Sequence, residues 1–184
     1  VVLTGLPGDP AVGATLETSA ASFAVSDDGK AVMALEQNGI RMFDGDANQW
    51  MLNHDAPAVT AAFVEGAHDA VVAGASGVFL VREAKGNASV EKLWEGDAVA
   101  AVVDGDAVLI ATREEGLLAM NRKDGLLRRL ECSCTAVTLT RMSQSVYRVN
   151  ELAEGPLWLV DLNGSTPRAV FVPADAKPEP AEEQ

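Results

Sequence analysis

Gly39-Ile40-Arg41-Met42-Phe43-Asp44-Gly45-Asp46 decides the fold, because here a glycine opens an apolar strand and an Asp/Gly turn closes it. Glycine permits a positive φ and Asp bonds to its own backbone, so these residues mark the turns. The same arrangement returns at Gly77, at Gly116 and, more loosely, at Gly155. The four glycines lie 38, 39 and 39 residues apart, and this period organises the whole chain.

Each repeat contains four short strands, a to d, separated by turn residues. Apolar runs such as 71–73 and 108–111 suit sheets that are covered on both faces, and no window shows a helical period free of Gly or Pro. We therefore expect an all-β chain of antiparallel strands. The expected strands are 22–26, 31–36, 40–43 and 49–53; 59–64, 69–74, 78–82 and 89–94; 99–103, 107–112, 117–121 and 126–132; 136–141, 145–150, 157–161 and 168–172.

A repeat of roughly 40 residues with four strands is the signature of a β-propeller blade. One blade cannot cover both of its own faces, whereas blades stacked around an axis cover one another. We therefore predict a β-propeller segment of four four-stranded antiparallel blades plus a half blade at the N-terminus. Four and a half blades suggest an open arc of a larger ring. An ordinary β-sandwich is the alternative, and the regular spacing favours the propeller.

The period also predicts the internal boundaries of the chain. Residues 1–173 form the propeller segment, with a half blade over 1–20 because this stretch aligns with strands c and d. The blades are expected at about 21–55, 56–97, 98–134 and 135–173, and we expect the natural protein to continue upstream into further blades. Residues 174–184 are acidic and rich in proline without large apolar side chains, so we expect a disordered tail.

Two stretches resemble known propeller families. The segment 23–32, with Asp28-Gly29 at its turn, resembles the strand–turn–strand hairpin of WD-repeat, YVTN-type and related bacterial propellers. The pattern over 155–161 resembles their strand c, and the last repeat is similar to the C-terminal end of uncharacterised secreted bacterial propellers. The resemblance implies the fold and an extracytoplasmic location, periplasmic or secreted, and brings no known activity.

Composition excludes some functions. The formal net charge of −13 repels phosphate backbones, so we expect no nucleic-acid partner, and it also disfavours anionic membrane surfaces. No apolar run is long enough to span a bilayer as a helix. The charge instead suits a basic partner or a divalent cation.

The two cysteines, Cys132 and Cys134, are two residues apart. On an extended strand their Cα atoms would lie at roughly 6.6 Å, near the upper limit for a disulfide. Two half-buried free thiols are therefore the favoured expectation, and an intrachain bridge is the alternative.

The loops that join d to a and b to c share one rim of a propeller, and by resemblance to the class they usually carry its functional residues. Acidic side chains recur in these loops, so they form either a solvated rim or a cation site with oxygen ligands. No catalytic, cofactor or metal motif is present, and we expect no cofactor. The candidate contact residues are His54, Asp55, Glu95, Asp97, Arg113 and Glu114.

Together these features favour a non-catalytic propeller platform that binds a protein or a small ligand, with its remaining blades in the same full-length chain. The alternative is a propeller-class hydrolase of the calcium-dependent lactonase type, with most of its site in the missing blades. That enzyme needs carboxylates that converge on one metal, and the strands nearest the axis, such as 59–64 and 99–103, offer few polar side chains.

Overall fold

In the computed structural model, every regular element among the described residues is a β-strand. The structure describes residues 2–4, 8, 11–15, 17–20, 22–37, 39–44, 48–52, 58–86, 88–132, 134, 136–149, 157–164 and 166–173. The expected tail over 174–184 lies outside the described residues.

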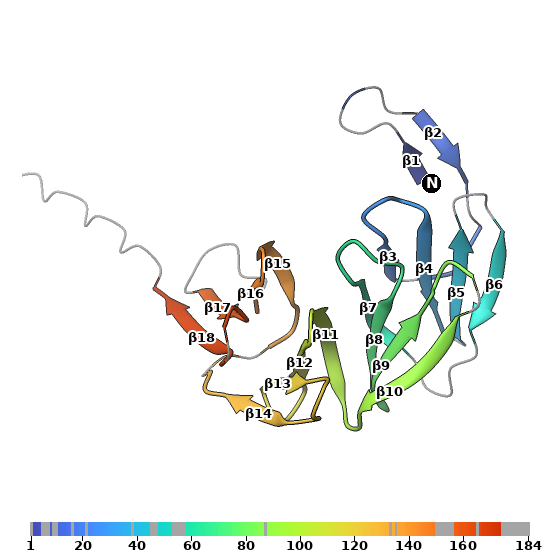
Figure 1. Ribbon diagram of the computed structural model, residues 1–184. Helices are drawn as coiled ribbons and strands as arrows, with labels where there is room; N and C mark the ends of the chain where they lie inside the picture. The colour runs from blue at the N-terminus through green and yellow to red at the C-terminus, as the bar shows by residue number, and fades with distance from the viewer. Residues whose placement is uncertain are drawn as a thin grey trace, which may run out of the picture.

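The strands form four four-stranded antiparallel sheets that follow one another around an open arc (Figure 1). We call these sheets blades 1 to 4. A two-stranded sheet, β1 (Val2–Thr4) paired with β2 (Ala11–Ala14), precedes them. Blade 1 contains β3 (Ser22–Val25), β4 (Ala31–Glu36), β5 (Gly39–Asp44) and β6 (Gln49–Leu52); blade 2 contains β7 (Ala58–Phe63), β8 (Ala70–Gly74), β9 (Gly77–Arg82) and β10 (Ser89–Trp94); blade 3 contains β11 (Ala98–Asp104), β12 (Ala107–Thr112), β13 (Leu117–Asn121) and β14 (Leu127–Leu130); and blade 4 contains β15 (Thr140–Ser143), β16 (Val146–Arg148), β17 (Leu157–Asp161) and β18 (Arg168–Val172).

In blades 1 to 3 the strands lie within two residues of the expected positions, whereas blade 4 departs from them. Its first strand was expected over 136–141 and lies over Thr140–Ser143. The turn to the next strand falls at residues 144–145, because Ser145 adopts a φ of +58° and its carbonyl accepts a hydrogen bond from Leu162 at 2.8 Å. The first strand of blade 4 therefore lies closer to the C-terminus than the sequence predicted.

The glycine that opens the third strand of a blade is required by its backbone and by its surroundings. Gly39, Gly77 and Gly116 all have positive φ, at +151°, +130° and +80°. At Gly77 the approach of the neighbouring strand adds a second requirement, since a Cβ would lie 2.1 Å from the carbonyl oxygen of Trp94. The period found in the sequence thus corresponds to a repeated backbone need.

Side chains alternate along each strand, so every blade offers one apolar face to the preceding blade and one to the next. In blade 2, Ala70 and Val72 pack with blade 1, whereas Val71 and Ala73 pack with blade 3. All five residues of β8 are consequently buried. One tryptophan packs against each of the three inter-blade clusters: Trp50 between blades 1 and 2, Trp94 between blades 2 and 3, and Trp158 between blades 3 and 4.

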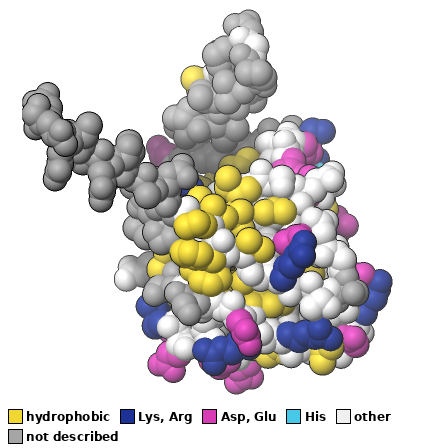
Figure 2. Space-filling model, turned by 90° about the vertical axis from the view of Figure 1, so that its left-hand side faces the viewer, with side chains coloured by type: hydrophobic (Ala, Val, Ile, Leu, Met, Phe, Trp, Pro, Cys, Tyr) yellow, Lys and Arg dark blue, Asp and Glu magenta, His cyan; other side chains and the backbone are white. Residues whose placement is uncertain are grey.

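Blade 4 has a neighbouring blade on one side only. Tyr147, Val149 and Val160 face blade 3 and are buried there. The alternate side chains point away from blade 3, on the side of the molecule where Figure 2 shows a broad hydrophobic area. We call this the open face of blade 4. By strand register its centre contains Arg148, Leu157, Leu159, Val170 and Val172, and Thr140, Val146 and the Asp161–Arg168 ion pair lie on the same face.

Replacing Gly77 by alanine tests the backbone requirement. We expect Gly77→Ala to lower the free energy of unfolding by about 3 kcal/mol, because a positive φ and a collision with backbone both oppose the new Cβ. Gly86 is the matched control, since it has no positive φ and a Cβ there would meet nothing within 4 Å. Urea unfolding measures both variants, and an equal small loss in each would contradict the requirement.

Candidate functional site

Among its described residues, the rim singled out by the sequence contains one ion pair between two candidate residues, Asp97 and Arg113. Arg113 Nε donates to Asp97 Oδ2 at 2.8 Å, and the backbone N–H of Arg113 donates to the Asp97 carbonyl at 3.1 Å. Glu95 pairs with Lys92 at 3.2 Å, and Glu114 is exposed. His54 and Asp55 lie outside the described residues. Asp97 and Arg113 are therefore brought together, and their contact ties the loop before β11 to the end of β12.

The two cysteines on this rim form a disulfide, so the expectation of free thiols was wrong. The strand expected over 126–132 ends earlier, at Leu130, so neither cysteine lies on it. The Cα atoms of Cys132 and Cys134 are 5.1 Å apart, closer than the roughly 6.6 Å of an extended strand and within the usual range for a bridge. The disulfide lies in the connection between blades 3 and 4.

The opposite rim, made by the turns between first and second strands and between third and fourth strands, links different blades. Asp27 Oδ2 in blade 1 accepts a hydrogen bond from the Gly66 backbone N–H in blade 2 at 2.8 Å. Asp28 Oδ2 lies 3.0 Å from His68 Nε2. Hydrogen bonds from Lys30 N–H and Ser26 Oγ, together with His68, hold the pKa of Asp28 far below its ordinary value.

Four side chains from three blades meet further along this rim. Arg141 in β15 pairs with Glu65, in the turn after β7, and so joins blade 4 to blade 2 past blade 3. Beside them the Tyr147 hydroxyl donates to Asp104 Oδ2 at 3.2 Å. Burial, and then the negative charge of Asp104, raise the pKa of Tyr147 to about 12.

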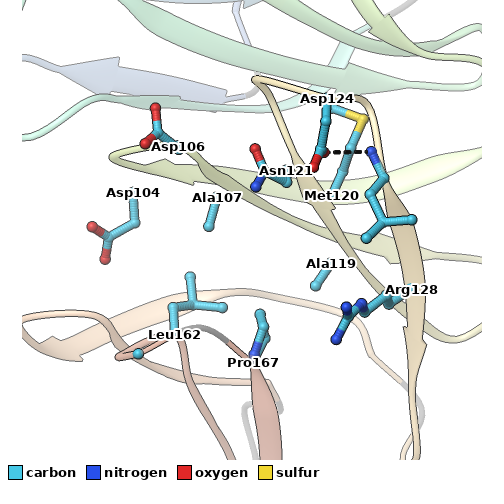
Figure 3. A pocket seen from close by; sticks show the side chains of 12 residues that line it. Asp104, Asp106, Ala107, Ala119, Met120, Asn121, Asp124, Arg128, Leu162 and Pro167 are labelled. Carbon is cyan, nitrogen blue, oxygen red and sulfur yellow. Dashed lines mark hydrogen bonds between the residues drawn. The ribbon is translucent and has the colours of Figure 1, made fainter.

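Asp104 also borders a pocket of about 480 Å³ between blades 3 and 4 (Figure 3). This volume falls within the range of small-ligand sites, about 300–1,000 Å³. Its apolar part continues the packed cluster between these two blades, to which Ala119 and Leu162 belong. The lining residues are Asp104, Asp106, Ala107, Ala119, Met120, Asn121, Asp124, Leu126, Arg128, Leu162, Gly164 and Pro167.

The polar part of the pocket contains three carboxylates and one guanidinium. Asp106 Oδ2 accepts a hydrogen bond from Lys123 Nζ at 2.5 Å, and Asp124 Oδ1 accepts one from the Leu126 backbone N–H at 2.9 Å. The hydrogen bonds of Asp104, Asp106 and Asp124 within the described residues use one carboxylate oxygen each. Carboxylates and Arg128 lie at different parts of the wall, around the apolar side chains (Figure 3).

In the part of the chain that the structure describes, no three His, Cys, Asp or Glu side chains gather closely enough to hold a metal ion. The same residues include no helix long and apolar enough to cross a membrane. The carboxylates of the pocket are therefore spread around its wall and do not converge on one point.

Sequence reasoning missed this pocket because it placed function on the other rim. One signal was present: the turns 104–106 and 121–124 of blade 3 carry Asp104, Asp106 and Asp124 within 21 residues. These three side chains line the same pocket only because of the way blade 3 packs against blade 4.

Comparison with known proteins shows the fold. No family model and no curated protein matches the chain. Among solved structures, the β-propeller domain of Cps50 (Swd1) from Myceliophteria thermophila matches with a TM-score of 0.62 and 17% identity, over 78% of this chain and 52% of that one. Dihydro-heme d1 dehydrogenase NirN, in complex with DHE, matches with a TM-score of 0.60 and 15% identity, over 83% of this chain and 37% of that one. The chain is a β-propeller segment, and it spans about half or less of these solved chains.

The single tyrosine of the sequence allows the rim cluster to be tested by titration. We expect the absorbance of tyrosinate in the folded protein to report a pKa of about 12 for Tyr147, against about 10 in urea. Because the fold favours the neutral phenol, its contribution to stability is complete below about pH 10 and decreases between pH 10 and 12.

The variant Asp104→Asn separates the two causes of the shift. Its Tyr147 pKa should fall below that of the wild type yet stay above 10, because burial is the larger cause. Circular dichroism recorded in parallel establishes that the sheets are intact. A folded-state pKa near 10 in the wild type would contradict the buried contact.

Proposed function

We propose that this chain is part of a non-catalytic β-propeller platform, and that the pocket between blades 3 and 4 receives a basic side chain of a partner protein. The observation that carries the proposal is the lining of this pocket. A lysine or arginine side chain has an aliphatic stem and a charged head. The pocket offers apolar side chains for the stem and the carboxylates of Asp104, Asp106 and Asp124 for the head.

The charge of the whole chain supports a basic partner. The formal net charge of −13 attracts a positively charged surface over a distance and raises its rate of encounter. The carboxylates are distributed around the pocket, which suits the elongated, multi-donor head of an arginine better than a compact metal ion.

We further propose that the remaining blades of the ring lie in the same full-length chain and that the protein works outside the cytoplasm. The incomplete arc supports the first point, together with the greater length of the matched structures. The Cys132–Cys134 bridge supports the second, since disulfides persist in oxidising compartments. A calcium-dependent propeller hydrolase is the alternative function, and no feature of the described residues favours it.

Titration with Nα-acetyl-arginine amide, followed by amide shifts in NMR spectra, tests the pocket. We expect shifts centred on residues 104–107 and 121–128, and about tenfold weaker binding in Asp106→Asn/Asp124→Asn, because two partly exposed charge contacts are lost. The neutral analogue Nα-acetyl-citrulline amide should bind at least as weakly to the wild type.

The matched control is Glu114→Gln/Glu115→Gln, which removes the same charge from the opposite rim. Glu114 and Glu115 are both exposed, and neither lines the pocket. This variant should bind the arginine probe as the wild type does. Equal weakening in both double variants would show that binding follows net charge alone, and shifts confined to the 95–115 rim would place the site where the sequence first suggested.

A further inference from the structure

We infer that the open face of blade 4 is an inter-blade interface, and that the blade which covers it in the full-length chain places a carboxylate opposite Arg148. The inference rests on the part of the proposed function that assigns further blades to the same polypeptide. It is independent of the basic partner and of the pocket.

The first support is continuity with three interfaces that the structure already contains. In blades 1, 2 and 3, a cross-strand pair at the centre of the sheet packs against the following blade: Met33 with Met42, Val71 with Leu80, and Leu109 with Ala119. The first member of each pair is at most 1% exposed. In blade 4 the pair on the corresponding face is Arg148 with Leu159.

The second support is the apolar character of the centre of this face, beside the Asp161–Arg168 ion pair at one end of the strands. Leu159 pairs with Val170 and Leu157 with Val172, so one surface carries all four side chains. Val170, on the outermost strand, is 41% exposed. Figure 2 shows the continuous hydrophobic area on this side of the molecule. A surface of this kind matches the faces by which blades 1 to 3 pack on one another.

Arg148 provides the third support and indicates which chemical group the covering blade presents to it. It stands where the preceding blades bury an apolar side chain, and its Nε atom is already buried without a hydrogen-bond partner. A blade that covered this face would remove more water from the guanidinium, and an unpaired buried charge is strongly destabilising. A carboxylate accepts bidentate hydrogen bonds from arginine and resolves that conflict. The covering blade is therefore apolar with an Asp or Glu opposite Arg148.

Cysteine labelling compares the full-length protein with the 184-residue chain. Leu159→Cys places a thiol at the centre of the open face, where the equivalent Leu80 and Ala119 of blades 2 and 3 are buried. Val90→Cys places one on the exposed strand β10, while Cys132 and Cys134 are bridged. We expect a maleimide to label Leu159→Cys about tenfold more slowly in the full-length protein, because covered sites react only during local opening. Val90→Cys should react equally in both.

Substitution of Arg148 tests the carboxylate. Arg148→Glu should lower the thermal midpoint of the full-length protein by several degrees more than that of the 184-residue chain. Lys85→Glu makes the same charge change on an exposed turn and should affect the two alike. Equal midpoints for Arg148→Glu and Arg148→Met would overturn the assignment of an acidic partner.

Two other outcomes would overturn the interface itself. Equal labelling of Leu159→Cys in both proteins would show that no further blade covers the face. Protection of Leu159→Cys in the 184-residue chain, with a doubled mass in light scattering, would assign the face to a second copy. Neither outcome depends on the arginine probe, so failure here is distinguishable from failure of the basic pocket.

Discussion

Packing of one blade on the next is the interaction on which this structure depends. Each blade is a sheet with two apolar faces, and a single sheet of this kind would leave both exposed to water. Alternation along β8 sends Val71 and Ala73 to one neighbour and Ala70 and Val72 to the other. The same arrangement places turns from successive blades side by side. Links between blades, such as Asp27 with Gly66 and Tyr147 with Asp104, follow from that placement.

The two rims use charge in different ways. On the rim that contains Asp97 and Arg113, opposite charges of one blade pair with each other. On the other rim, Glu65 and Arg141 join blades 2 and 4, and the turns of blade 3 surround a pocket with Asp104, Asp106 and Asp124. A pocket between blades can carry a specific function because its walls come from a rigid packed cluster, whereas its polar groups come from turns that tolerate substitution.

Much of the architecture was predictable because it depends on local rules. A turn at Gly77 needs a positive φ whatever surrounds it, and apolar runs such as 108–111 indicate a strand covered on both faces. The departures are equally local in origin. Ser145, a residue that rarely adopts positive φ, moved the first turn of blade 4, and the early end of β14 brought Cys132 and Cys134 close enough to bridge.

By itself, the sequence determined the all-β class, the four-strand repeat and the positions of most strands, since period and turn chemistry act between near neighbours in the chain. The tertiary structure alone decided which turns meet. Asp104 and Tyr147 are 43 residues apart and Glu65 and Arg141 are 76 apart, so their contacts depend on the angle at which blades stack. The same stacking left Arg148 on an open apolar face, and no pattern within one strand could have predicted that position.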